Sequence, residues 1–325
     1  MNKAKLSSKW VQLRRLPREE MKKKERSSRY RSFINHWQLY ILLILPIFYV
    51  FVFKYLPMYG IQIAFKQYNL SLGIKGSPWA GLKWFQMFFN SQQFSRLLVN
   101  TIGISVYQLS ASFFLPIILA IAMNEMRNAK FRKTVQMISY MPHFLSVVVI
   151  CGILQQVLSL NGMVNNLMAG FGMDKIQFLG RPELFKHIYV WSGIWQNVGY
   201  NAIIYIAALS GISPELHEAA KVDGANIWQR IWNVDIPGIM PTAVILLIMN
   251  SANILSVGFE KVFLLQNPLN MRASDVISTY VYRLGMVNME YSLSTAVGLF
   301  QSVVSMILLC TVNWISSRLS ETSIW

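Results

Sequence analysis

The chain is poor in charged residues, cysteine and histidine. Charged residues make up 14% of its 325 positions, whereas soluble domains carry about 25%. The two cysteines, Cys151 and Cys310, lie in separate apolar stretches, so we expect no disulfide framework. The four histidines show no HExxH or similar metal-ligand spacing, and no P-loop pattern GxxxxGK(S/T) occurs. These absences argue against a disulfide-stabilised secreted domain, a metalloenzyme and an ATP-hydrolysing subunit.

Apolar residues are abundant instead, at 54% of the chain, and they gather in long runs. Six segments carry little charge and are long enough to cross a hydrocarbon core of ~30 Å: Trp37–Met58, Leu97–Met123, Val135–Leu158, His187–Leu209, Ile239–Leu265 and Leu293–Ile315. The sequence therefore predicts an all-α polytopic membrane protein with six transmembrane helices. Lys54, Glu260 and Lys261 fall near predicted span ends, where long charged side chains can reach the membrane surface.

Positive charge is concentrated before the first apolar segment. Residues 1–31 hold twelve Lys/Arg and three Glu, and so contribute +9 of the formal charge of +16. The connection after the second segment, residues 124–134, is also basic. The positive-inside rule places both regions in the cytoplasm, and with six spans both termini lie there. We expect a basic cytoplasmic tail, residues 1–36, and a membrane domain, residues 37–325. Nucleic-acid binding is not expected, because no folded module accompanies the basic run.

The connection between the fourth and fifth segments, residues 212–238, has an unusual pattern for a cytoplasmic loop. The SPE sequence at Ser213–Glu215 supplies an N-cap, a first-turn proline and a first-turn acid. Gly224 marks a break, and a second amphipathic helix is predicted to end at Pro237. Its apolar stripe consists of Ile227, Trp228, Ile231 and Trp232. A helical pair outside the bilayer needs a partner to bury that stripe. A membrane-surface helix is the alternative, but the Lys/Arg-rich face of such helices is lacking.

This loop resembles the EAA loop of binding-protein-dependent ABC importer permeases. The match is EAAKVDGA at Glu218–Ala225, followed by Ile236-Pro237. The resemblance implies a type I ABC importer permease fold and a coupling helix that docks on an ATP-hydrolysing subunit. It also implies that Glu218 pairs with a basic residue of that subunit and that Gly224 permits the turn. The implied coupling residues are Glu218, Ala219, Ala220, Asp223, Gly224, Ala225, Ile231, Trp232 and Pro237. Many relatives carry phenylalanine where this chain has Ile231-Trp232, and the apolar character is kept.

The resemblance also implies partners and a location. They are an ABC ATPase dimer that holds ATP and magnesium, a second permease subunit, expected to be a paralogue, and an extracytoplasmic solute-binding protein. The chain itself would be a non-catalytic, multi-pass subunit of a bacterial cytoplasmic membrane and would bind no cofactor or metal. The segments Gly81–Phe85, Asn100-Thr101 and Thr279–Tyr282 resemble those of carbohydrate permeases. They favour the subgroup that imports complex or acidic oligosaccharides, such as alginate or pectin fragments.

A sugar pathway needs amide and aromatic side chains facing a water-accessible cavity. The fourth segment offers Asn197 and Tyr200, and the fifth offers Asn250 and Asn253. Because such side chains are costly against lipid, we expect them to face the interior of the bundle. We take these four as candidate substrate contacts. Hydrogen bonds between membrane helices are the alternative role for the amides, and the interfacial aromatic belt is the alternative for the tyrosine.

Two other classes of protein would share the six apolar segments. An ion-coupled secondary transporter would usually show intramembrane acids or repeated halves, and neither is evident. A membrane enzyme would need a catalytic pair, a metal cluster or a nucleophile motif, and none is found in the sequence. The EAA-like loop would have no role in either class. The predicted function is therefore that of an oligosaccharide permease subunit in an ABC importer.

Overall fold

The computed structural model describes residues 37–251 and 257–319, and the predicted basic tail lies outside them. The chain separates into two compact units, Met1–Ile61 and Gln62–Trp325. Helices dominate the described residues, and the first half contains α3 (Trp37–Val50), η1 (Phe51–Tyr55), η2 (Leu56–Phe65), α4 (Gly73–Gly76), α5 (Lys83–Phe89), α6 (Gln92–Asn124), α7 (Ala129–Tyr140), η3 (Met141–Phe144) and α8 (Val147–Val157). The expected all-α class is confirmed. The division into tail and membrane domain stays a prediction.

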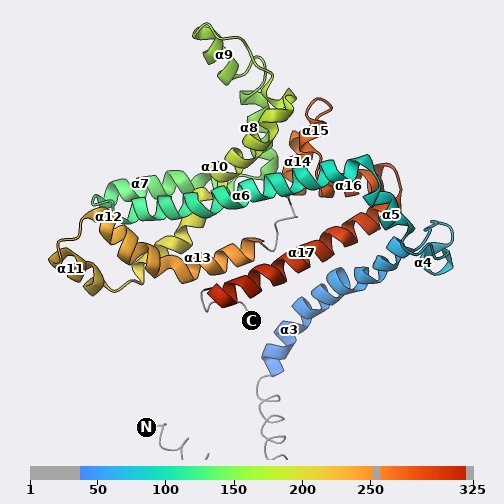
Figure 1. Ribbon diagram of the computed structural model, residues 1–325, viewed down its shortest axis with the longest axis horizontal. Helices are drawn as coiled ribbons and strands as arrows, with labels where there is room; N and C mark the ends of the chain where they lie inside the picture. The colour runs from blue at the N-terminus through green and yellow to red at the C-terminus, as the bar shows by residue number, and fades with distance from the viewer. Residues whose placement is uncertain (1–36, 252–256, 320–325) are drawn as a thin grey trace, which may run out of the picture. The chain divides into compact units, whose positions relative to one another are not determined.

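The second half continues the same helical pattern. Its elements are α9 (Met163–Gly170), η4 (Phe178–Gly180), α10 (Pro182–Ser210), α11 (Pro214–Val222), α12 (Ile227–Arg230), η5 (Ile231–Asp235), α13 (Ile236–Ser251), α14 (Phe259–Leu265), α15 (Met271–Ser274), α16 (Ile277–Tyr282), η6 (Arg283–Val287) and α17 (Tyr291–Leu319). In the second unit, α11 and α12 lie at one end of the long helices, and α14, α15 and α16 lie toward the other (Figure 1).

Helix α10 lies at the centre of the second unit. It packs along α6 and also contacts α7 and α13. One apolar cluster joins Ile104 of α6 to Phe185, Tyr189 and Val190 of α10. A second cluster joins Ala120 of α6 to α10 and to the first turns of α13. Helix α10, which carries several amides, is therefore fixed by apolar contacts with α6 and α13.

The predicted count of six spans is not confirmed. Four described helical stretches are long and apolar enough to cross a membrane: Trp37–Phe65, Gln92–Asn124, Ile227–Ser251 and Tyr291–Ile315. A fifth is reached only if Ala129–Phe144 and Val147–Val157, which are bent by 99° at their junction, count as one span. The predicted fourth span lies within α10, which has 29 residues but is not among the apolar helices. Its internal amides lower its hydropathy.

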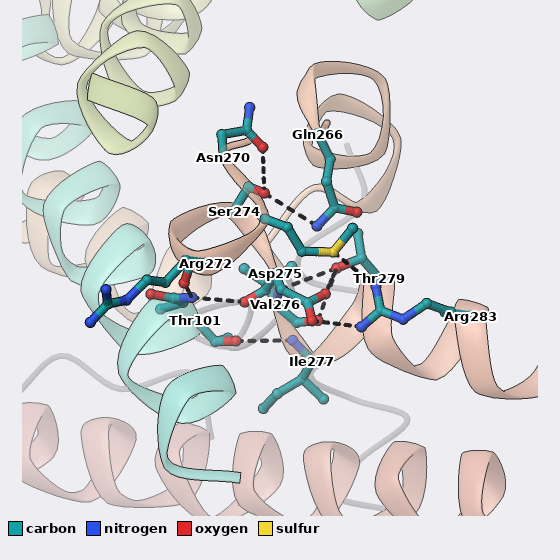
Figure 2. Close-up of polar contacts among 12 residues, drawn as sticks. Thr101, Gln266, Asn270, Arg272, Ser274, Asp275, Val276, Ile277, Thr279 and Arg283 are labelled. Atoms are coloured by element: carbon teal, nitrogen blue, oxygen red, sulfur yellow. Dashed lines mark hydrogen bonds and ion pairs between the residues drawn. The ribbon is translucent and has the colours of Figure 1, made fainter. Parts of the chain in front are cut away.

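Polar side chains fasten the segment between α14 and α17 to α6. Asp275 is fully buried, and its Oδ2 accepts a hydrogen bond of 2.6 Å from Arg283, while its Oδ1 accepts one of 3.1 Å from Thr279 (Figure 2). Asn100 donates to the backbone oxygen of Asp275 at 3.1 Å, and the Thr101 hydroxyl accepts from the Ile277 amide at 3.1 Å. Two segments singled out in the sequence, Asn100-Thr101 and Thr279–Tyr282, thus meet in one network.

Gly199 allows α10 and α7 to approach closely. A Cβ built at Gly199 would overlap the backbone carbonyl of Ser139 in α7. Small residues commonly permit such contacts between membrane helices. By contrast, Gly152 in α8 has no atom within 4 Å of a built Cβ.

We predict that Gly199→Ala destabilises the folded protein by about 1–3 kcal/mol, the usual cost of overpacking. The cause is that backbone atoms, rather than the end of a flexible side chain, occupy the space of the new methyl group. Thermal unfolding of the detergent-solubilised protein measures the change. Gly152→Ala is the matched control and should not lower the melting temperature. Equal melting temperatures for the two variants would contradict the close α7–α10 contact.

Candidate coupling loop and central cavity

The helical pair predicted in residues 212–238 begins and turns where the sequence indicates. Helix α11 begins after Ser213, whose side chain accepts a hydrogen bond of 3.3 Å from the Glu215 amide, with Pro214 at the first helical position. The chain then turns at Gly224, which has a φ of +78°. Such a left-handed backbone conformation favours glycine. These observations agree with the expected start of the first helix and with the break between the two helices.

The predicted end of the second helix at Pro237 is wrong. Helix α12 continues through the π-helical turn η5 into α13, and the apolar stretch Ile227–Ser251 passes through Pro237 without interruption. A proline inside a helix has no amide hydrogen and crowds the carbonyl of the preceding turn. The wider π turn directly before α13 is a known way to accommodate such a defect. The residues Ile227–Ser251 therefore form one continuous helical rod, which joins the second half of the loop to α13.

Two charge pairs join the loop to the long helices. The His217 Nε2 atom of α11 lies 3.4 Å from Oδ1 of Asp235 at the end of η5. Arg230 of α12 lies 3.5 Å from Glu125, the residue that follows α6. Asp235 is fully buried, and neither of its carboxylate oxygens has a hydrogen-bond partner among the described residues. The His217 imidazole is thus the polar side chain paired with this buried carboxyl group.

The surface of the loop exposes most of the predicted coupling residues. Glu218, Ala219, Asp223, Gly224, Trp232 and Pro237 are exposed, whereas Ala220, Ala225 and Ile231 are partly buried. Val222 is 87% exposed, Trp228 75% and Trp232 72%. Large apolar side chains that project from a capped helical pair form a surface suited to a protein partner.

A cavity of about 350 Å³ lies between α6, α10 and α13. Cavities of this size accommodate small ligands. The lining residues are Ser105, Gln108, Leu109, Ser112, Pro116, Tyr189, Gly193, Ile194, Asn197, Val198, Asn201, Asn250, Val257 and Gly258. They include neutral amides and hydroxyls, and no charged side chain is among them. The cavity can therefore offer hydrogen bonds to a polar solute.

The four candidate substrate contacts differ in their position relative to the cavity. Asn197 and Asn250 line the cavity. Tyr200 is not in the lining, because its ring stacks on His143 with centroids 3.8 Å apart and planes 5° apart. Asn253 lies outside the described residues. The structure thus brings Asn197 and Asn250 to one cavity and leaves Tyr200 beside it.

His143 is a site residue that sequence reasoning missed. Its Nδ1 lies 2.9 Å from Oδ1 of Asn197, while its ring stacks on Tyr200. The Asn197 amide also donates to the Gly193 carbonyl at 2.9 Å. His143 therefore fixes the orientation of an amide that lines the cavity. The sequence signal that could have identified His143 is its position directly after Pro142, where the third apolar segment bends.

Residues 112–321 match the family described as binding-protein-dependent transport system inner membrane component. The polygalacturonan/rhamnogalacturonan transport system permease protein YteP of Bacillus subtilis (strain 168) is 39% identical over 305 residues, which cover 94% of this chain and 95% of YteP. The protein LplB of the same organism is 38% identical and covers 88% of this chain and 91% of its own length. The chain therefore belongs to this family of transport permeases.

A solved structure supports the same family assignment. The chain aligns with a TM-score of 0.84 and 40% identity to a subunit of a bacterial alginate ABC transporter in complex with a periplasmic protein that carries an alginate pentasaccharide. The alignment covers 91% of this chain and 99% of that subunit. The chain thus has the type I ABC importer permease fold and is a multi-pass, non-catalytic membrane component. The ABC permease assignment is confirmed over the ion-coupled secondary transporter.

We predict that His217→Ala loosens the loop of residues 212–238, because it leaves the buried Asp235 carboxyl group without the imidazole that lies 3.4 Å away. Amide hydrogen exchange in α11 should become about tenfold faster, the size expected for one unsatisfied buried polar group. Adding Asp235→Asn to the same variant should restore slow exchange, since a neutral amide costs less to bury. Unchanged exchange in the single variant would show that the pair does not hold the loop.

Proposed function

We propose that this chain is one of two permease subunits that together import an acidic oligosaccharide across a bacterial cytoplasmic membrane. ATP hydrolysis on a separate ATPase dimer, which binds ATP and magnesium, supplies the energy. The observation that carries the proposal is the loop of residues 212–238, in which a capped, glycine-turned helical pair presents Glu218 and exposed tryptophans. This surface is built for a partner outside the bilayer, as the EAA resemblance implies.

The charge pairs give the loop a means of moving the membrane helices. Helix α11 is connected through His217 and Asp235 to η5, which continues into α13, and α12 is connected to the end of α6 through Arg230 and Glu125. Both α6 and α13 contribute to the cavity lining. A displacement of the loop by the ATPase subunit would therefore act on two walls of the cavity. We assign the coupling role to Glu218, Ala219, Ala220, Asp223, Gly224, Ala225, Ile231, Trp232 and Pro237.

The cavity is the proposed passage for the sugar. Asn197 and Asn250 supply amide groups that can hydrogen-bond to sugar hydroxyls. Tyr200 supports this wall from behind through its stacking on His143. An extracytoplasmic solute-binding protein would deliver the sugar to the membrane face opposite the loop. In this proposal residues 212–238 and both termini lie in the cytoplasm, as the positive-inside rule predicts. A second permease subunit, expected to be a paralogue, would complete the passage.

The substrate class rests on related transporters. YteP is named for polygalacturonan and rhamnogalacturonan, and the aligned structure belongs to an importer of the acidic polysaccharide alginate. Both names denote polymers that contain uronic acids. At 39–40% identity over nine-tenths of the chain, an acidic oligosaccharide is the best-supported cargo for this permease.

We predict that Glu218→Lys uncouples ATP hydrolysis from sugar uptake. Reversing the charge on the exposed face of α11 removes the proposed pairing with a basic residue of the ATPase subunit. Uptake by proteoliposomes that contain the whole transporter should fall at least about tenfold, as expected when a charge-assisted contact is lost. The amount of inserted permease should be unchanged, because Glu218 is exposed.

The matched control reverses a charge away from the loop. Glu183 is an exposed acid in the first turn of α10, so Glu183→Lys changes the net charge equally. This variant should keep the wild-type ratio of sugar molecules imported to ATP hydrolysed. Normal uptake by Glu218→Lys would overturn the coupling role of this residue.

A further inference from the structure

Lys261 of α14 is a buried cation beside the central cavity. The residue is 7% exposed, and its Nζ donates a hydrogen bond of 2.9 Å to the backbone oxygen of Tyr189. The same ammonium group lies 4.9 Å from the centre of the Tyr189 ring. Tyr189 is itself buried, and its hydroxyl accepts a hydrogen bond of 3.1 Å from the Gly258 amide. Lys261 is therefore held in place rather than extended toward the membrane surface.

The charge of Lys261 is not balanced by an acid. Among residues 37–251 and 257–319, no carboxylate lies within ion-pair distance of its Nζ, and the adjacent Glu260 is exposed. An ammonium group has three hydrogen-bond donors, and the described residues provide one acceptor. Burying a cation with so few partners costs several kcal/mol. Charged groups kept inside membrane proteins despite this cost commonly mark a substrate pathway.

Two residues that line the cavity adjoin the ammonium group. Tyr189 contacts it directly, through its backbone oxygen and its ring. At Gly193, a built Cβ would lie 3.2 Å from the Lys261 Nζ. The ammonium group thus occupies the space that a side chain at position 193 would need, and it lies directly behind residues of the cavity lining.

We propose that Lys261 is a specificity-determining residue that pairs with the carboxylate of a uronate unit passing through the cavity. The cavity lining supplies neutral hydrogen-bond partners for sugar hydroxyls, and Lys261 is a buried positive group directly beside it. At a buried ammonium, a charge-assisted bond to a carboxylate discriminates strongly against a neutral sugar. This inference rests on the proposed function, because it requires that the chain carries an acidic oligosaccharide.

The test compares one sugar with and without its charge. Proteoliposomes containing both permeases and the ATPase subunits, with the solute-binding protein added, are given trigalacturonate or its neutral methyl ester. The uptake ratio of acid to ester is measured for the wild type and for Lys261→Met, which removes the charge at similar volume. Because the solute-binding protein is the same throughout, its own preference cancels when the two ratios are compared. The ratio should fall about tenfold in the variant, the size expected for one charge-assisted hydrogen bond.

Lys83→Met is the matched control. Lys83 also lies over an aromatic ring, 5.0 Å from the centre of Trp84, but it is exposed and belongs to α5, which contributes no residue to the cavity lining. Its uptake ratio should equal that of the wild type. If Lys261→Met does not insert in the membrane, Gly193→Ala replaces it, since the new methyl group would crowd the ammonium while the charge remains. That variant should lower the same ratio.

The possible results of this experiment distinguish failure of the Lys261 proposal from failure of the proposed function. Equal loss of acid and ester uptake in Lys261→Met would assign Lys261 a structural role in joining α14 to α10 and overturn the inference. An unchanged ratio in a variant that transports normally would also overturn it, while the proposed function would stand. If the wild-type transporter, active on another sugar, imports neither trigalacturonate nor other uronate oligomers, the proposed substrate class is wrong and the role of Lys261 is withdrawn with it.

Discussion

The packing of α10 along α6 is the constraint on which the second unit of this permease depends. Both helices are long, and apolar clusters join them near each end of their contact. The cavity lies along the first of these clusters and shares Tyr189, Ile194 and Val257 with it. Since apolar residues hold the helix pair together, the same stretch can present amides and hydroxyls such as Asn197 and Ser105 without losing the fold. The cavity lining thus combines cluster residues with polar side chains of the same helices.

The same two helices connect the cavity to the loop of residues 212–238. Helix α10 leads directly into α11 through residues 211–213, and the end of α6 meets α12 through Glu125 and Arg230. On the far side of the Gly224 turn, α12 continues into α13 without a flexible joint. A force applied to the loop therefore reaches three cavity-lining helices through short, ordered connections. This arrangement suits a subunit that is driven by a partner and does not hydrolyse ATP itself.

Local signals in the sequence predicted part of this structure. The SPE cap at Ser213–Glu215 and the turn at Gly224 depend on neighbouring residues alone, and both were predictable. The uninterrupted helix through Pro237 was not, because the π turn that accommodates the proline has no clear sequence pattern. The burial of Lys261 was missed for another reason. Its place near a span end suggested a surface role, whereas its contact with Tyr189 joins residues far apart in sequence.

The π turn at Ile231–Asp235 also sets the angular phase between the two ends of the helical rod. One residue of an α-helix corresponds to a rotation of about 100°. A turn that holds an extra residue therefore changes the direction in which every later side chain projects, Asn250 among them. The direction of the cavity amide relative to the exposed Trp228 therefore depends on this turn. A residue inserted in η5 or deleted from it would rotate Asn250 relative to Trp228.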